Sequence, residues 1–452
     1  MKKNIRLKFI LFVASVFAAP AAAAAEAGEV WTLEDCMAYA VQHNFDARSK
    51  LIDQDDYRRD YTARLAAHFP SLSAGASTGI SFGRNVDPET NTYETRSSLS
   101  NYYGIDMGWT LFNGFAMVNY TRAAKLGKLM GVHEQQQVED RIALQTMQAY
   151  ITAVYADGLV GLAREQLEEQ QELLRQVRRE SDLGLKSPAD VAQIEADIAG
   201  AEFSLIKSEN ELQTALLKLK DQMNYPVDRS LRIESDMQIA QVVEEEQTVD
   251  EIFETALETL PGIKVAEFVL DRSKLNYKAS KAALYPSLRF GAGISTNYYT
   301  GLGGATQKNQ MPYFRALDSN LGESMSVSMS IPIFSNLNNR MNMYRYRNNV
   351  QRSKIELERT TREARSEIEQ AVMDLNNSLK EYMQAGKKVA ATELAYKVTR
   401  RKFEEGLFTA IDVQTSYNSL LLSKIEYLNS RLMYVGKCRQ VNYYKGIPLV
   451  SF

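Results

Sequence analysis

The chain has 452 residues, which is long for one compact core and predicts two or three domain-sized units. Its 53 basic and 56 acidic side chains give a net charge of −3 at pH 7, and this mild acidity argues against a nucleic-acid partner. The two cysteines, Cys36 and Cys438, are too few for a disulfide framework, and they could be paired or both free. The three histidines show no close pairing of the kind that binds a metal ion.

Residues 1–25 are typical of a secretory signal peptide. Lys2 and Lys3 begin a basic segment, residues 9–17 form a short apolar run, and Ala23-Ala24-Ala25 offers a small-residue cleavage site. The apolar run is too short to span a bilayer, and no later stretch of about 18 apolar residues follows. We therefore expect an exported chain that begins near Glu26 and has no transmembrane helix.

An internal repeat is the most informative feature of the sequence. Pro70-Ser71-Leu72 reappears as Pro286-Ser287-Leu288, and farther along a constant spacing of 222 residues relates Arg178 to Arg400, Gly184 to Gly406 and Asp190 to Asp412. Self-similarity over such a distance indicates two copies of one structural unit. The predicted organisation is a first repeat over 26–226, a connector over 227–249 and a second repeat over 250–448.

Each repeat begins with a helical segment, over about 33–66 in the first and 250–282 in the second, before Pro70 and Pro286. Two segments of alternating apolar and polar residues follow. They predict strands over 71–83 and 98–112 in the first repeat and over 287–299 and 324–334 in the second. The alternation is strictest from Met325 to Ile331, where every second residue is serine.

This alternation fits a transmembrane barrel strand, but it also fits a soluble sandwich strand with one face in water. The polar faces are rich in Ser and Gly, and Trp109, Phe112, Tyr298 and Tyr299 lie near strand ends, which favours a membrane. Four strands cannot close a barrel, and open sheet edges are not tolerated in lipid. The sequence therefore predicts a membrane barrel that several protomers share.

Long helical segments follow the strands and predict antiparallel helical hairpins over 115–222 and 337–442. The stretches 116–182 and 337–404 contain no proline, and some 65 residues at 1.5 Å each make a helix of about 100 Å. The returning helices carry apolar residues at three- and four-residue spacing, such as Ile194, Ile198 and Ala201. This spacing is typical of coiled-coil packing and gives the stripes a structural role.

The turn of each hairpin, or tip, has a distinct sequence. Gly184 and Gly406 can end a helix in the left-handed conformation, and Ser187 and Thr409 can cap the helix that follows. Asp190 and Asp412 then lie in a first helical turn, where negative charge is favourable. Asp412 is either only a residue that favours the helix start or one that faces a narrow tunnel mouth. The candidate tip set is Leu183, Gly184, Leu185, Ser187, Asp190, Gly406, Leu407, Thr409 and Asp412.

Two arginine pairs, Arg178-Arg179 and Arg400-Arg401, lie about one turn before the tips. One interpretation is solvated surface charge. The other is a candidate latch, in which one arginine of each pair bonds to a neighbouring hairpin and keeps a tunnel closed. A single surface ion pair is worth only about 0–1 kcal/mol, so a latch of this kind needs repetition around a symmetric assembly.

With its signal peptide, duplicated unit, paired strands and long hairpins, the sequence resembles the TolC family of outer-membrane factors over essentially the whole mature chain. The most specific matches are the Gly-Leu, hydroxyl and Asp-Val residues of the two tips, with Trp31 to Cys36 resembling the family's first helix. Members often carry a second acid three residues after the tip aspartate. Gln193 and Thr415 occupy those positions here, so a double carboxylate ring is not expected.

The resemblance implies an α+β membrane protein that forms a homotrimer. Four transmembrane strands from each protomer would make one 12-stranded β-barrel in the lipid of the outer membrane, and the hairpins would form a helical barrel in the periplasm. It also implies that the tips dock a periplasmic adaptor protein and an inner-membrane pump.

Enzyme and cofactor motifs are missing from the sequence: there is no phosphate-binding Gly loop with Lys-Ser/Thr, no His-Glu-x-x-His and no Cys-x-x-Cys. We expect no enzyme, no cofactor and no metal. The favoured function is the passive exit duct of a tripartite efflux pump for small molecules. The alternatives are the outer-membrane duct of a type I protein secretion system and an exported structural coiled-coil protein without a pore.

Overall fold

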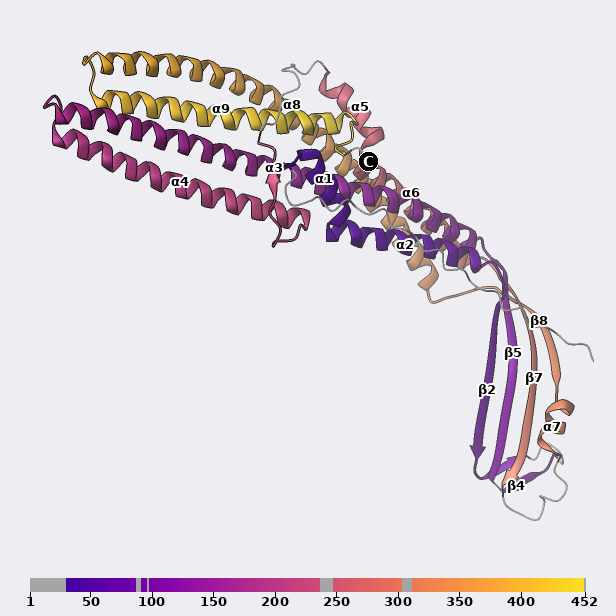
Figure 1. Cartoon of the computed structure of the whole chain (residues 1–452). Helices are drawn as coiled ribbons and strands as arrows, with labels where there is room; N and C mark the ends of the chain where they lie inside the picture. The colour runs from indigo at the N-terminus through magenta and orange to yellow at the C-terminus, as the bar shows by residue number, and fades with distance from the viewer. Residues whose placement is uncertain (1–29, 87–90, 96, 236–246, 303–310, 451–452) are drawn as a thin grey trace, which may run out of the picture.

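The computed structural model describes residues 30–86, 91–95, 97–235, 247–302 and 311–450. The predicted signal segment over 1–25 and part of the predicted connector over 227–249 lie outside this set. The molecule is elongated, with a β-sheet at one end, two helical hairpins at the other, and shorter helices between them (Figure 1). It combines helices and a separate sheet, as the sequence predicts.

The sheet contains four antiparallel strands in the order β2-β5-β7-β8. Their bounds are Ser71–Ser81 for β2, Ser97–Asn113 for β5, Ser287–Leu302 for β7 and Gly322–Ser330 for β8. The predicted ends were wrong by a few residues. β2 stops before Gly83, whose φ of 115° leaves the extended conformation, and β8 stops before Pro332, which cannot donate to a ladder.

The register gives the sheet two unlike faces. Ile105 stands between Ala74 and Ile294 on one side, while the next residue, Asp106, stands between Ser73 and Gly293 on the other. One face is therefore apolar and the other is lined by Ser and Gly. The apolar side chains are largely exposed in the single chain. Within the described residues, the outer edges of β2 and β8 pair with no further strand.

Two small elements near the far end of the sheet were not predicted. Strands β3 (Arg84–Val86) and β4 (Tyr93–Thr95) form a short hairpin beyond β2. Helix α7 (Tyr313–Ser319) precedes β8 and lies against the apolar face, where the Tyr313 hydroxyl is 2.7 Å from the hydroxyl of Tyr103. Segments this short carry too few residues for a periodic signal.

The single helices predicted over 33–66 and 250–282 are each two helices in the structure. The first divides at Asn44, whose side chain accepts a 2.8 Å hydrogen bond from the Asp46 backbone and caps the second part. The second divides at Leu260, because Pro261 starts a new helix. The resulting elements are α1 (Leu33–His43), α2 (Phe45–Ala66), α5 (Val249–Thr259), α6 (Pro261–Lys281) and the short 3₁₀ helix η1 (Ala282–Leu284).

Two long hairpins occupy the other end of the molecule. The first is formed by α3 (Ala116–Asp182) and α4 (Pro188–Met223), and the second by α8 (Asn338–Glu404) and α9 (Ala410–Tyr444). α3 and α8 each contain 67 residues, which at 1.5 Å per residue is about 100 Å. Figure 1 shows the two hairpins side by side, ending at a similar level.

A tight bend joins the sheet to each long helix. Phe115 and Leu337, the residues before α3 and α8, both have a positive φ of 64°. Gly114 precedes the first bend with φ 65°, and a Cβ there would lie 2.9 Å from the Ala282 carbonyl oxygen. Only glycine fits that position, because both its conformation and the close backbone exclude a side chain.

Three clusters of buried side chains hold the helices together. The largest lies where α1 crosses α3 and α4, around Tyr150, Leu219 and Cys36. A short parallel pair, β1 (Val30–Trp31) with β6 (Arg232–Ile233), lies beside it. Both cysteines are free, and burial raises the pKa of the Cys36 thiol. Among the helices that the structure describes, none combines the length and the apolarity needed to cross a membrane.

Candidate functional site

The first tip is a five-residue turn between α3 and α4. Gly184 adopts φ 75°, and the Leu185 backbone N–H donates back to the Glu180 carbonyl over 2.8 Å, which closes the end of α3. Ser187 and Asp190 form a reciprocal capping box at the start of α4, at 3.2 and 3.0 Å. These contacts hold Leu183 and Leu185 in the solvent at the tip.

The second tip repeats this geometry. Gly406 adopts φ 76°, and the Leu407 N–H donates to the Lys402 carbonyl over 2.8 Å. Thr409 and Asp412 form the capping box, and hydrogen bonds from the Thr409 side chain and backbone hold the pKa of the Asp412 carboxyl below its usual range. Leu407 is exposed, as the leucines of the first tip are.

The first arginine pair makes contacts only within its own hairpin. Arg178 on α3 forms an ion pair with Glu195 on α4, and both side chains are about half exposed. Arg179 donates from Nε to the Arg175 carbonyl one turn earlier, over 3.2 Å. Neither arginine contacts the second hairpin through a hydrogen bond or ion pair to a described residue.

The second pair behaves differently, because Arg400 reaches across to the other hairpin. Its Nη1 lies 2.7 Å from Oε1 of Glu169 on α3, and its Nε lies 3.6 Å from Glu404. Tyr396, one turn earlier on α8, donates its hydroxyl to the same Glu169 oxygen. Burial, then the Glu169 carboxylate, raises the pKa of Tyr396. Arg401 is exposed and has no ion pair with a described residue.

Apolar packing encloses this polar contact. Leu173, Val177 and Ile194 of the first hairpin form one buried cluster with Phe403 and Val413 of the second. The contact between Arg400 and Glu169 therefore lies at the edge of a small core that the two hairpins share. We call the three side chains Glu169, Tyr396 and Arg400 the inter-hairpin cluster.

The sequence identified Arg400 but missed Glu169 and Tyr396. These two residues are 227 positions apart, and neither belongs to the repeated tip motif. A signal was present nonetheless: at the 222-residue spacing, Tyr396 corresponds to Leu174 and Glu169 to Ala391. A polar residue that replaces an apolar one in a coiled-coil stripe indicates a specific partner.

Metal and cofactor chemistry is not supported by the side chains that are described. In that part of the chain, no group of three or more His, Cys, Asp or Glu residues is placed to hold a metal ion. The tips instead present exposed leucines on tightly closed turns, held by a cluster beneath them. This arrangement suits docking and opening rather than bond chemistry.

The chain is similar in sequence and in fold to known proteins. A family model described as outer membrane efflux protein matches residues 38–224 and 252–437, more than half of the chain. The outer membrane efflux protein BepC of Brucella suis is 22% identical over 80% of this chain and 73% of its own length. The probable efflux pump outer membrane protein TtgC of Pseudomonas putida is 23% identical over 92% of this chain and 82% of its own.

Among solved structures, the CmeC outer membrane channel of Campylobacter jejuni has a similar fold. The two superpose with a TM-score of 0.78 at 15% sequence identity, over 92% of this chain and 85% of that one. At this identity the likeness concerns the arrangement of strands and hairpins.

Proposed function

The chain belongs to the outer membrane efflux protein family, and from this premise we propose that it is one protomer of a trimeric channel that forms the passive exit duct of a tripartite efflux pump. The protein is a transport protein of the outer membrane, and its helical part lies in the periplasm. The observation that carries the proposal is the sheet: one face apolar, one face of Ser and Gly, and two edges without a partner strand.

A shared barrel resolves this arrangement. The edge strands β2 and β8 would pair between neighbouring protomers, so three copies of the four-stranded sheet would give 12 strands with no open edge. The apolar face would then meet lipid and the Ser/Gly face would line a water-filled pore. Without a nucleotide site in the sequence, the energy for transport would come from another protein.

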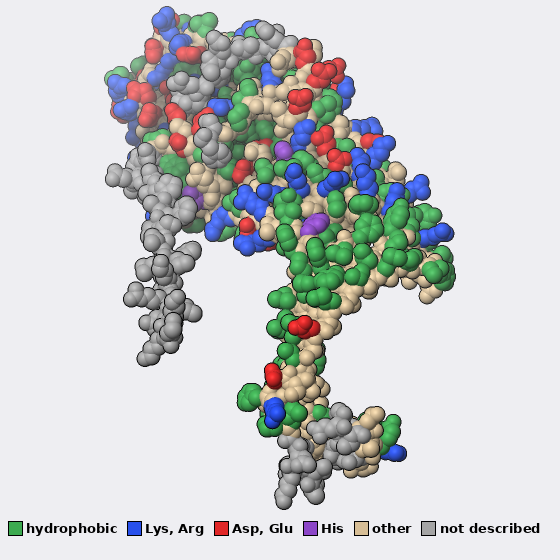
Figure 2. Space-filling view, turned by 90° about the vertical axis from the view of Figure 1, so that its right-hand side faces the viewer, with side chains coloured by type: hydrophobic (Ala, Val, Ile, Leu, Met, Phe, Trp, Pro, Cys, Tyr) green, Lys and Arg blue, Asp and Glu red, His purple; other side chains and the backbone are tan. Residues whose placement is uncertain are grey.

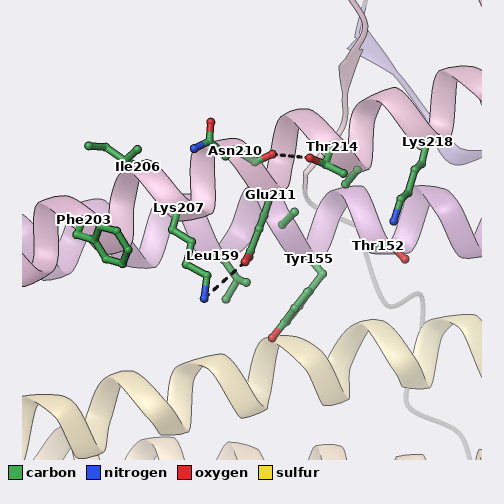
Figure 3. A pocket seen from close by; sticks show the side chains of 12 residues that line it. Thr152, Tyr155, Leu159, Phe203, Ile206, Lys207, Asn210, Glu211, Thr214 and Lys218 are labelled. Atoms are coloured by element: carbon green, nitrogen blue, oxygen red, sulfur yellow. Dashed lines mark hydrogen bonds and ion pairs between the residues drawn. The ribbon is translucent and has the colours of Figure 1, made fainter.

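Exposed apolar side chains on the hairpins support the assembly. A groove of about 520 Å³ on α3 and α4 is bordered by Phe203 and Ile206 (Figure 3). Phe203 is 71% exposed in the single chain. On α8, Leu394 and Val398 are also exposed, at 64% and 46%. Such surfaces are expected to be buried in an oligomer, and we propose that the first hairpin of one protomer packs against the second hairpin of the next.

We further propose that the two halves of the chain, 26–226 and 250–448, are copies of one unit joined by residues 227–249. The equal lengths of α3 and α8 support this organisation, as do the matching left-handed residues Phe115 and Leu337. Each copy would contribute two strands and one hairpin.

The tips are proposed to dock a periplasmic adaptor that connects to an inner-membrane pump. Leu183, Leu185 and Leu407 are exposed on rigid turns, and fixed apolar side chains lose little entropy on binding. The inter-hairpin cluster would keep the tunnel mouth closed until docking separates Arg400 from Glu169. Small molecules are the proposed cargo, which agrees with the naming of the Pseudomonas putida relative as an efflux-pump component.

An unheated gel of outer-membrane extract tests the assembly. A band near three times the protomer mass of 51.0 kDa that collapses to one protomer on boiling is expected. Purified protein in planar bilayers should give stable conductance steps. A protein that stays in the soluble periplasmic fraction would contradict the channel and favour a structural coiled coil.

A second experiment separates the two kinds of duct. Cells that lack the protein should become sensitive to small toxic compounds while their set of secreted polypeptides stays unchanged. Loss of a secreted polypeptide from the medium with unchanged sensitivity would instead identify the outer-membrane duct of a type I secretion system.

A further inference from the structure

A strongly basic segment lies where the helices meet the sheet. The first 18 residues of α3, Ala116–His133, contain three Lys or Arg and no Asp or Glu. The first 18 residues of α8, Asn338–Ile355, contain five and none, and residues 271–281 at the end of α6 contain four against Asp271 alone. Figure 2 shows Lys and Arg side chains around the part of the helical body that adjoins the sheet.

Several of these bases share one side of the molecule. Arg340 and Arg347 are seven residues apart on α8, and Lys274 and Lys281 are seven apart on α6, so each pair lies on one helix face. All four are exposed. The four bases Lys274, Lys281, Arg340 and Arg347 are called the basic collar below.

The opposite side of the same helices faces the Ser/Gly side of the sheet. Asn342 and Tyr346 of α8 line a cavity of about 510 Å³ together with Ser287 and Ser330, which are paired on the Ser/Gly face. At 100° per residue, Arg340 lies about 160° around α8 from Asn342. Because the cavity opens on the Ser/Gly side, the basic collar lies on the side of the apolar sheet face.

Most of the collar's charge is not neutralised by neighbouring side chains. Lys274 forms an ion pair with Asp271 at 2.8 Å. Arg340 and Arg347 form no ion pair with any described residue, and the Lys281 ammonium lies over the Tyr277 ring at 4.4 Å. Farther from the sheet the pattern changes, since Arg359 on α8 bonds both Glu356 and Glu363. Unpaired positive charge is therefore concentrated next to the sheet.

The collar also lies at the right level for a membrane surface. Arg340 is the third residue of α8, and Arg347 is about 10 Å farther along the helix axis. Lys281 is the last residue of α6, separated from β7 only by the short η1 segment. A headgroup layer is several ångströms thick, so bases over this span would reach from the headgroups into the water just beyond.

We propose that the basic collar binds the anionic phospholipid headgroups of the periplasmic leaflet of the outer membrane. The inference goes beyond the proposed channel function and shares with it only the placement of the sheet in lipid. The chemistry is direct: long Lys and Arg side chains lay their apolar stems along the protein and extend their charges to phosphate groups. Each such base near an anionic surface strengthens binding by about fivefold.

Tryptophan quenching by brominated lipids measures the proposed enrichment on the full chain. The protein has two tryptophans. Trp109 lies at the collar end of the apolar face, beside Phe290, whereas Trp31 packs against Tyr39 and Tyr225 in the helical core and should stay unquenched. In phosphatidylcholine vesicles with 30% phosphatidylglycerol, the anionic lipid should quench Trp109 with at least about threefold preference per molecule. The preference should disappear in 0.5 M NaCl, because salt screens surface charge.

A triple variant and a matched control test the assignment. Lys281→Gln with Arg340→Gln and Arg347→Gln should abolish the preference for phosphatidylglycerol. Arg345→Gln with Arg352→Gln removes two bases from the same part of α8 but from a different face, and should leave it intact. Equal quenching by both lipids in the unaltered protein, or equal loss in the two variants, would overturn the proposal.

Two further outcomes keep this inference separate from the channel. Trp109 that neither lipid quenches would mean that the sheet is not in the bilayer, which overturns the channel as well as the collar. Normal conductance with equal quenching would overturn the collar alone. If purified peptidoglycan sacculi bind the unaltered protein but not the triple variant, and the lipid preference is absent, the collar's partner is the cell wall and the lipid proposal fails.

Discussion

The two hairpins have almost the same dimensions and the same tip geometry, yet the equivalent arginines contact different partners. Arg178 pairs with Glu195 inside the first hairpin, whereas Arg400 pairs with Glu169 across the two hairpins. At the 222-residue spacing, Glu195 corresponds to Tyr417, which is buried. Arg400 therefore finds no carboxylate at that position of its own hairpin and turns to the neighbouring one.

Burial distinguishes the two pairs energetically. The Arg178 and Glu195 side chains are 57% and 48% exposed, but those of Arg400 and Glu169 are only 18% and 24% exposed. Water screens the first pair and leaves it worth about 0–1 kcal/mol. The second is partly desolvated, so the loss of one partner leaves a charge that water reaches poorly. A few substitutions thus convert a local contact into a link between hairpins.

The largest expected effect comes from Arg400→Ala, which leaves Glu169 bonded to Tyr396 alone. The free energy of local opening should fall by about 2 kcal/mol, and this corresponds to roughly 30-fold faster amide hydrogen exchange. The change should appear on both sides of the contact, around residues 165–177 and 396–404. Faster exchange on the α8 side only would show that Arg400 does not hold the first hairpin.

The capping residues should behave alike in the two hairpins. Ser187→Ala and Thr409→Ala each remove one half of a capping box, and each should cost about 1 kcal/mol of local stability. Exchange rates at the first turns of α4 and α9 measure the two effects. A cost at one tip more than about three times that at the other would show that the tips differ in more than their arginines.

Acid should weaken the second tip through Asp412. The pKa of this carboxyl is lowered in the folded protein, so its contribution is fully present above the ordinary carboxyl pKa and is lost as the pH falls through the lowered value. Exchange protection at the start of α9, corrected for the intrinsic pH dependence, should stay constant from pH 7 to about pH 5 and decline only in stronger acid. In Thr409→Ala this decline should shrink, because the responsible hydrogen bonds are gone.

The smallest effect is expected from Arg178→Ala. Its exposed ion pair should contribute less than about 0.5 kcal/mol, so exchange at the first tip should change by less than about threefold. The variant is the matched control for Arg400→Ala, since both remove an arginine at the same place in a hairpin. If both variants opened the tips equally, the difference in burial would not decide their roles.

Much of the architecture follows from the sequence, because it depends on periodic patterns. Alternation over 71–83 and 324–334 and the proline-free stretch from 116 to 182 identified strands and long helices within a few residues. The break at Asn44 was missed, since the helical pattern continues on both sides and only a capping side chain marks it. Helix α7 was missed because it is too short for periodicity.

The candidate site was only partly predictable for a different reason. Tip geometry is local: glycine, a hydroxyl residue and an aspartate within seven positions determine it. The inter-hairpin cluster depends on how two hairpins pack, and nothing near Glu169 in the sequence specifies Tyr396 as its partner. Long-range pairs of this kind require the three-dimensional arrangement or a comparison of the two repeats.

The equal length of α3 and α8 has a consequence for how such a chain can change over generations. Both helices contain 67 residues, and their tips meet only because neither outruns the other. A heptad inserted into the first hairpin alone would preserve its coiled-coil phase but would carry Glu169 about 10 Å past Arg400. Insertions in one half must therefore be matched in the other, and the two copies are bound to grow or shrink as a pair.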